Sequence, residues 1–210
     1  AANSVLVHGV GLRERDVDRV IASGAAVIWC PTSNHALLGR SLDPRRLCAA
    51  GRLALGSDSR LSGARDLLDE MRAVAVLGEL SPRQLLGLVT ADAARILRLP
   101  SRGSLAPGAR ADLVIVEDRG GNAESNLTDI RRSDIRAVVR DGVPRIADPD
   151  FAEWFAATGV DAVPVTLDGK PKLLAGPLAE PALLALEPGL ERVAGRNAHA
   201  RDATIEARCY

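Results

Sequence analysis

The alternation of short apolar runs with longer amphipathic segments over residues 4–98 constrains the fold of this chain more than any other feature. Three runs have the length and composition of buried strands: residues 4–8, 25–29 and 52–56. Four segments have the periodicity of helices: residues 13–23, 44–50, 64–77 and 82–97. Short apolar strands separated by amphipathic helices are typical of a parallel sheet that is buried on both faces. The sequence therefore predicts an α/β fold for this part of the chain.

Local signals mark the ends of several of these elements. Gly24 follows the first helix and is a natural stop, and Ser81 is a typical N-cap before Pro82 at the first helical position. The stretch CPTSNHALLGRSLD, residues 30–43, is interpreted as a long polar turn. Ser33 and Asn34 could close such a turn through hydrogen bonds to backbone groups.

Beyond residue 99 the pattern changes to glycine- and proline-punctuated runs with the alternation of β-strands. Asp141-Gly142 and Asp168-Gly169 each stand between two apolar runs and predict β-hairpin turns. The expected division of the chain is an α/β part at residues 1–99, a small β-rich domain at 100–175 and a poorly defined C-terminal extension at 176–210.

Composition excludes several classes of protein. Basic and acidic residues number 27 each, so there is no bulk basic field that would favour nucleic acid or an anionic membrane. No apolar run approaches the roughly 18 residues that indicate a transmembrane helix. Cys30, Cys48 and Cys209 are widely spaced, which argues against a disulfide framework and suits a reducing compartment. We therefore expect a cytoplasmic protein.

Polar features follow the three predicted strands, at the ends where parallel sheets place functional loops. His8 ends the first strand, CPTSN follows the second, and Asp58 follows the third. An imidazole and a carboxylate on one rim could bind a metal ion or transfer protons. Each also has a structural interpretation: His8 as a rim histidine bonded to backbone, and Asp58 as a helix cap or turn residue.

Other cysteine, histidine and glycine residues are weaker candidates for a functional site. No sequence context marks Cys30 as a nucleophile with a lowered pKa. His35 is expected in a loop, and His199 lies in a C-terminal stretch without periodicity. Gly9-Val10-Gly11 superficially suggests a dinucleotide loop, but the third glycine is replaced by Glu14. A nucleotide-binding α/β domain is therefore a weak alternative.

Six segments taken together resemble the C-terminal half of the amidohydrolase superfamily: VLVHGVGL, CPTSN, LALGSDS, DLLDEMRAV, TADAARILRL and GSLAPGARADLVIVED. The resemblance covers residues 4–145 and is strongest to the branch that contains cytosine, guanine and S-adenosylhomocysteine deaminases and triazine chlorohydrolases. It implies the C-terminal part of a (β/α)8 TIM-type barrel, strands 6–8, followed by a small β-sandwich domain built from both chain ends.

The resemblance also implies roles for individual residues. His8 would contact a metal-bound hydroxide or the substrate, and Asp58 would bind the metal and move a proton from the attacking water to the leaving nitrogen. Ser33 and Asn34 would shape the pocket for a small-molecule substrate. The reaction would be the hydrolysis of a non-peptide carbon–nitrogen bond in a cyclic amidine or amide. Zinc is the expected metal, with iron and manganese as alternatives.

The departures from the family pattern are equally informative. The family's His-x-His pair and a further metal histidine are absent, and we expect them upstream of Ala1. A truncated, non-catalytic homologue that serves as a binding or assembly module is therefore an alternative. Three strands cannot close a barrel, so we expect an exposed strand edge and no turnover by this chain alone. An exposed edge can pair with a second copy, so a homo-oligomer is an open option. The segment FAEWFAATGVDAV, residues 151–163, has no place in the pattern.

Overall fold

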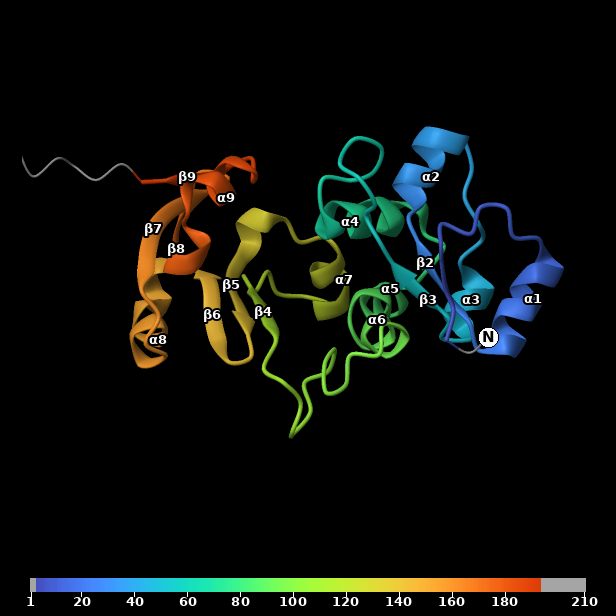
Figure 1. Cartoon of the computed structure of the whole chain (residues 1–210), viewed down its shortest axis with the longest axis horizontal. Coiled ribbons are helices and arrows are strands. Elements are labelled where there is room, and N and C mark those ends of the chain that lie inside the picture. The colour runs from blue at the N-terminus through green and yellow to red at the C-terminus, as the bar shows by residue number, and fades with distance from the viewer. Residues whose placement is uncertain (1–2, 194–210) are drawn as a thin grey trace, which may run out of the picture.

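A computed structural model of the protein describes residues 3–193 and contains two sheets. The first is a parallel sheet of three strands in the order β1-β2-β3: β1 (Val5–Val7), β2 (Ala26–Trp29) and β3 (Leu53–Leu55). It lies in the blue-to-green half of the molecule, and the second sheet lies in the yellow-to-red half (Figure 1). The predicted α/β arrangement of strands and helices is confirmed for the first half.

Six α-helices accompany the parallel sheet: α1 (Glu14–Ser23), α2 (Pro31–Leu38), α3 (Arg45–Ala49), α4 (Leu67–Leu77), α5 (Pro82–Val89) and α6 (Ala91–Ile96). Gly24 ends α1 in the left-handed conformation, and Ser81 caps α5 in a reciprocal pair with Gln84, as the local signals predicted. Val27 and Leu53 at the centre of the sheet are completely buried among these helices. Burial of this apolar surface is the main force that stabilises the half.

Two predictions about the helices are wrong. Residues 31–38 form helix α2 rather than a turn, because Pro31 presets the first helical residue and Glu70 of α4 accepts a hydrogen bond from the backbone N–H of Thr32. The predicted helix over residues 82–97 is two helices. The backbone leaves the helical region at Thr90, with φ −126° and ψ −104°, and α6 then turns to pack on β2 and β3.

Strand β1 is exposed, as the family resemblance predicted for an edge of an incomplete barrel, whereas its apolar composition alone predicted a buried strand. Val5, Leu6 and Val7 retain 38%, 39% and 54% of their accessible surface. Among the described residues β1 pairs only with β2, so it forms one edge of the sheet. The apolar run forms the predicted strand, and the described residues cover it only in part.

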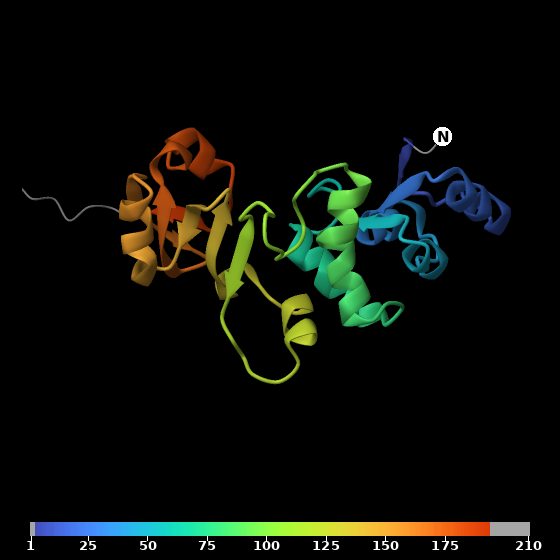
Figure 2. The ribbon, with the colours of Figure 1, turned by 90° about the horizontal axis from the view of Figure 1, so that it is seen from below.

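The second sheet has six antiparallel strands in the order β4-β5-β6-β8-β7-β9: β4 (Leu113–Val116), β5 (Ile135–Arg140), β6 (Val143–Ala147), β7 (Ala162–Leu167), β8 (Lys170–Ala175) and β9 (Leu190–Arg192). Both Asp-Gly pairs form the predicted hairpin turns. Asp141 and Gly142 have φ values of 53° and 79°, and Asp168 and Gly169 have values of 48° and 80°. Figure 2 shows the two sheets at opposite ends of the long axis.

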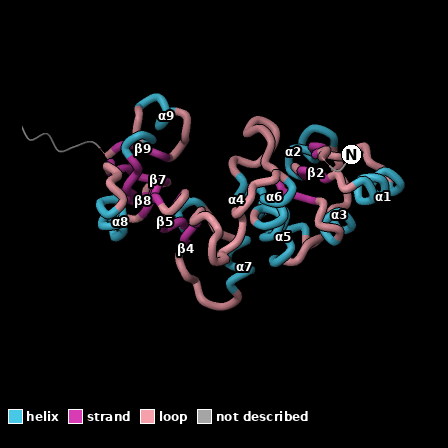
Figure 3. Tube along the Cα trace, turned by 60° about the horizontal axis from the view of Figure 1, so that its bottom comes forward, coloured by secondary structure: helices cyan, strands magenta, loops and turns pink. Residues whose placement is uncertain are grey.

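The remaining helices are short: α7 (Ala123–Thr128), α8 (Ala152–Ala157), α9 (Pro181–Ala185) and the 3-10 turns η1 (Arg132–Asp134), η2 (Pro149–Phe151) and η3 (Gly176–Leu178). Helix α7 packs against α4 and α5, beside the parallel half rather than among the strands (Figure 3). The unplaced segment at residues 151–163 contains α8, which buries Phe155 against the second sheet.

Strand β9 pairs with β7, so part of the predicted C-terminal extension belongs to the second sheet. The boundaries proposed at residues 99 and 175 stay predictions. His199 and Cys209 lie outside the described residues. Within residues 3–193, no helix has both the length and the apolar character needed to cross a bilayer.

Candidate functional site

The candidate site lies at the carboxyl ends of the three parallel strands. His8 directly follows β1, and its backbone N–H continues the ladder by donating to the carbonyl of Ile28 at 2.9 Å. Its imidazole Nδ1 lies 3.0 Å from Asn34 Oδ1, and its Nε2 lies 3.9 Å from Asp58 Oδ2. The structure thus brings together the histidine and the carboxylate that the sequence placed at the ends of separate strands.

Asp58 is held by a hydroxyl from the neighbouring helix. The Ser33 hydroxyl donates to Asp58 Oδ2, and Ser33 Oγ also lies 3.2 Å from Ser62 Oγ. Asp58 has a positive φ of 56°, a conformation that aspartate tolerates better than most residues. The Asp58 side chain stays partly exposed while Ser33 is buried. The carboxylate is therefore fixed on its buried side by Ser33 and open to solvent on the other side.

Asn34 orients the imidazole from the other side. The Asn34 amide Nδ2 donates to Ser41 Oγ at 2.9 Å, and Trp29 Nε1 donates to the same hydroxyl at 2.8 Å. This arrangement leaves Asn34 Oδ1 facing His8 Nδ1, where it accepts a hydrogen bond from the ring N–H. In the neutral imidazole, Nε2 then carries the lone pair on the side of Asp58.

A buried carboxylate anchors the helix that supplies Ser33 and Asn34. Glu70 of α4 has no accessible surface, and its Oε1 accepts a hydrogen bond from the Thr32 backbone N–H at 3.0 Å. The Thr32 hydroxyl donates to the other oxygen of Glu70 and accepts from the Ala64 N–H at 3.0 Å. A negative charge at a helix N-terminus is stabilised by the free N–H groups there. Glu70 therefore fixes α2 on α4 and sets the positions of Ser33 and Asn34.

Sequence reasoning missed Glu70 and Thr32. A signal was nevertheless present, because Glu70 stands next to Met71 and one turn before Val74 on the apolar face of α4. A glutamate at a core position of an amphipathic helix must be hydrogen-bonded. Its partner, however, lies 38 positions away and could not be identified from spacing.

Cys30 hydrogen-bonds to the backbone of Asp58, whereas His35 makes no side-chain hydrogen bond to the described site residues. Burial, followed by the negative charges of Asp58 and Glu70, raises the pKa of the Cys30 thiol to about 11, so Cys30 is protonated near neutral pH and a poor nucleophile. His35 lies on the exposed face of α2, in its last turn, rather than in a loop.

An apolar hollow of about 490 Å³ opens beside the site. It lies between residues 6–12 and the α2 side chains Ser33, Asn34, Leu37 and Leu38. His8 lines it from the β1 side, so the three residues predicted to contact substrate share one concave surface. Apolar walls with a few convergent polar groups are the usual lining of a small-molecule site.

The donor set does not fit a divalent metal by itself. Nowhere in the described part of the chain do three or more His, Cys, Asp or Glu side chains gather closely enough to hold a metal ion. His8 and Asp58 offer two donors, whereas catalytic zinc sites take three protein ligands and an open position. A metal at this site would need donors beyond residues 3–193.

Sequence comparisons place these features among known proteins. The model of the Amidohydrolase family matches residues 1–163. A 5-methylthioadenosine/S-adenosylhomocysteine deaminase of Haloquadratum walsbyi is 33% identical over 127 residues, which are 56% of this chain and 28% of that protein. An 8-oxoguanine deaminase of Pseudomonas aeruginosa is 32% identical over 119 residues, 52% of this chain and 26% of that protein. The chain thus spans little more than a quarter of the length of these curated relatives.

Solved structures agree with the sequence comparisons. A zinc-bound adenosine deaminase of Xanthomonas campestris is 27% identical, with a TM-score of 0.62 over 74% of this chain and 40% of that one. A triazine hydrolase variant shares the fold at 21% identity, with a TM-score of 0.61 over 75% of this chain and 40% of the other. Because the family model matches more than half of its length, this chain belongs to the amidohydrolase family.

Proposed function

We propose that this chain supplies part of the catalytic centre of a hydrolase that cleaves non-peptide carbon–nitrogen bonds in a small molecule, as a deaminase of cyclic amidines or amides does. The observation that carries this proposal is the meeting of His8, Ser33 and Asp58 from three separate elements, with His8 Nε2 3.9 Å from Asp58 Oδ2. The family match and the deaminase relatives support the reaction class.

In this proposal Asp58 holds and moves the proton. Its carboxylate accepts a hydrogen bond from Ser33 and stays partly exposed next to His8, where it would accept a proton from the attacking water and return it to the leaving nitrogen. His8, oriented by Asn34, would align the attacking water by accepting a hydrogen bond at Nε2. Once protonated at Nε2, the ring would donate to the negative charge that develops on the attacked group. Ser33 and Asn34 would also shape the wall of the substrate pocket.

We propose a divalent metal, zinc before iron or manganese, with Asp58 as one ligand and the other donors outside residues 3–193. A bound metal would lower the pKa of its water and so supply hydroxide at neutral pH. The zinc in the adenosine deaminase structure supports this choice, whereas the two donors found here do not hold a metal alone.

We further propose that β1, β2 and β3 are the sixth to eighth strands of a TIM-type barrel, with the six-stranded sheet as the composite domain. The apolar, exposed β1 supports the barrel arrangement, because unpaired strand edges of this composition are a liability unless they are covered. On this basis residues 3–193 alone would have no turnover.

An alternative is a non-catalytic binding or assembly module, and the shortage of metal donors in residues 3–193 favours it. One experiment separates the two. Metal content and ammonia release from a panel of aminopurines would be measured for the product of the whole reading frame, for its Asp58→Asn variant and for Asp18→Asn, which changes an exposed aspartate of α1.

The catalytic proposal predicts bound metal and turnover in the parent and in Asp18→Asn. It predicts that Asp58→Asn loses at least about a hundredfold in kcat. If metal content and hydrolysis are both unchanged in Asp58→Asn, the role assigned to Asp58 is wrong. Absence of both metal and turnover in the parent would favour the binding module.

A further inference from the structure

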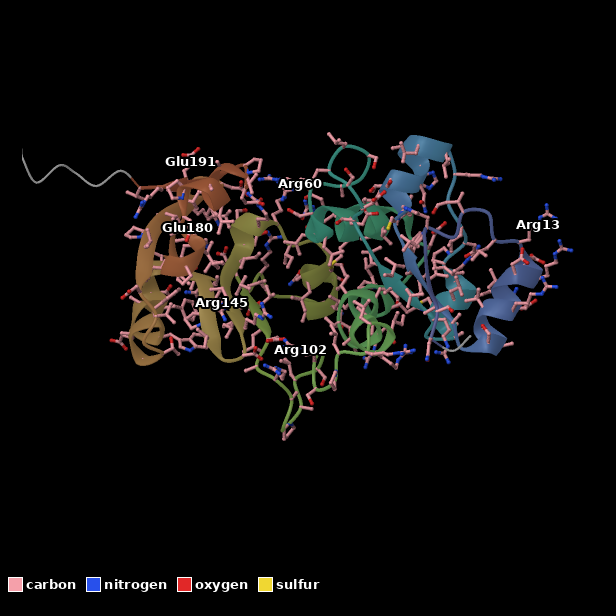
Figure 4. All side chains as sticks on the ribbon, in the orientation of Figure 1. Arg13, Arg60, Arg102, Arg145, Glu180 and Glu191 are labelled. Carbon is pink, nitrogen blue, oxygen red and sulfur yellow. The ribbon has the colours of Figure 1, made fainter. Side chains whose placement is uncertain are left out.

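Residues 57–66, the loop that connects β3 to α4, carry Asp58 and are tied to the second sheet by charged side chains. Arg60 Nη2 lies 2.7 Å from Glu187 Oε2. Arg65 Nη2 lies 3.2 Å from Asp168 Oδ1 and donates to the carbonyl of Pro188 at 2.7 Å. Figure 4 shows Arg60 between this loop and the C-terminal segment that contains α9 and β9.

A third arginine joins the two acidic partners. Arg132 of η1 donates through Nε and Nη2 to the two oxygens of Asp168, at 3.2 and 2.8 Å, and through Nη1 to Glu187. It also donates to the Pro188 carbonyl at 2.8 Å. The Arg132 side chain is largely buried, so this part of the cluster is screened less than a surface pair. We call Arg60, Arg65, Arg132, Asp168 and Glu187 the arginine clamp.

The backbone around the clamp is fitted to it. Gly189 has a φ of +80°, and a Cβ at this position would lie 2.2 Å from Asp168 Oδ1. The Asp168 N–H donates to the Gly189 carbonyl at 2.7 Å, so the β7–β8 turn and residues 187–189 support one another. The hydrogen bonds from Arg132 lower the pKa of Asp168, and contact with Arg65 acts in the same direction.

Hydrogen bonds within residues 57–66 hold this loop in a compact turn. Arg60 Nε donates to the Arg65 carbonyl at 3.0 Å, and the amides of Ser62 and Gly63 donate to the Ser59 carbonyl at 3.1 and 2.7 Å. The Ala64 amide reaches Thr32 Oγ1. A force that holds Arg60 and Arg65 therefore also restricts the turn in which Asp58 and Ser62 face Ser33.

The acidic half of the clamp lies outside the part of the chain that matches the family. That match ends at residue 163, whereas Asp168, Pro188 and Glu187 belong to residues 164–193. We propose that residues 164–193 are a positioning segment, which holds the Asp58 loop in place through the arginine clamp. This goes beyond the proposed function, because the claim concerns the order of the loop whether or not the complete protein is an enzyme.

The test compares Asp168→Asn/Glu187→Gln with Glu191→Gln. Asparagine tolerates the positive φ at residue 168, and Glu191 is an exposed acid four positions from Glu187 that forms no ion pair among the described residues. Hydrogen exchange would be followed in peptides that cover residues 57–66, with peptides from α1 as reference. Ring resonances of His8, assigned by their loss in His8→Gln, report the carboxylate of Asp58 independently of activity.

We expect exchange in residues 57–66 to be about fivefold faster in the double variant and unchanged in Glu191→Gln. The His8 ring resonances should move only in the double variant. Unchanged exchange and unchanged His8 resonances, with β7 and β8 still protected, would overturn the proposal. If the double variant loses protection in β7 and β8, Arg60→Gln decides, because it breaks the link from the loop side: faster exchange supports the clamp, and unchanged exchange refutes it.

Discussion

The two halves of this chain differ in how a buried charged residue is hydrogen-bonded and in the residues on their edge strands. In the antiparallel half, the buried Lys172 is paired with Asp148 and donates to the Ile135 carbonyl. One edge strand of this sheet, β9, ends in the charged residues Glu191 and Arg192, whereas the other, β4, is apolar. In the parallel half, the buried Glu70 accepts only from the neutral donors of Thr32 among the described residues, and the edge strand β1 is apolar.

These differences indicate that the edges and the buried charges have different structural roles in the two halves. Charged residues on β9 are a usual protection of a sheet edge, whereas an exposed Val-Leu-Val strand is suited to pair with something further. The charge of the buried Lys172 is compensated within its own half by Asp148. Glu70 instead fixes the helix that carries Ser33 and Asn34, so its cost in desolvation serves the candidate site.

The largest predicted effect is on Glu70. Glu70→Ala should lower the free energy of unfolding by about 3 kcal/mol, because the partly buried amide and hydroxyl of Thr32 lose their acceptor and a cavity remains at the buried Glu70. Urea denaturation followed by Trp29 fluorescence in a Trp154→Phe background would measure it, since Trp29 lies in the core of the parallel half.

Glu79→Ala, at an exposed position, is the matched control for Glu70→Ala and should change the free energy of unfolding by less than about 0.5 kcal/mol. Lys172→Met, which keeps the stem of the side chain, provides the comparison in the other half and should cost less than Glu70→Ala because Asp148 keeps its contact with Arg136. Equal losses for Glu70→Ala and Glu79→Ala would remove the distinction between the two halves.

The second effect concerns the apolar edge. We expect the 210-residue chain to associate through the open edge of β1. Val7→Lys should weaken that association about tenfold, because a charge on β1 opposes pairing of this edge with another strand. Sedimentation equilibrium would measure it. Val76→Lys replaces an apolar side chain on α4 that is more exposed than Val7 and should leave association unchanged. Equal effects of the two variants would show that β1 is not the contact.

A smaller effect on the arginine clamp is expected when the pH is lowered. The pKa of Asp168 in the folded protein is below its ordinary value of 3.8, so its contribution to the clamp is complete above 3.8 and is lost as the pH falls through the folded-state value. Hydrogen exchange in residues 57–66, corrected for the intrinsic pH dependence, should accelerate in that range before exchange in α1 does. Simultaneous acceleration in both segments would argue against a local role.

The smallest effect is on Cys30. Because its pKa is raised to about 11, only about one thiol in a thousand is ionised at pH 8. Mass spectrometry of chain treated with iodoacetamide should show alkylation of Cys30 that is slow at pH 8 and accelerates up to about pH 11. Rapid alkylation at pH 7 would contradict the environment described for this thiol.

The features predicted best from the sequence are those that depend only on residues close together in the chain. Gly24 and the two Asp-Gly turns act through their own backbone, and the Ser81 hydroxyl acts on a residue three positions away; each forms the predicted feature. The proximity of His8 and Asp58 was also predictable, because the carboxyl ends of parallel strands share one rim. Their catalytic roles stay predictions.

What the sequence could not predict depends on distant partners. Helix α2 was interpreted as a turn because its N-terminal acceptor, Glu70, lies on another helix. The apolar residues of β1 alone predicted burial, and only the resemblance to part of a barrel predicted an exposed edge, because exposure depends on what lies against the strand. The arginine clamp joins residues more than 100 positions apart, with Arg65 and Asp168 separated by 103, which no local pattern encodes.

The central claim is that this chain carries two residues of a metal-dependent site whose other donors lie elsewhere. Equilibrium dialysis against zinc, with metal counted per chain, tests it most directly on the 210-residue chain. We predict less than one tightly bound zinc per chain, because His8 and Asp58 offer two donors where about three are needed. Tight, stoichiometric zinc that is lost in Asp58→Asn would contradict the account and would show that the site is complete within this chain.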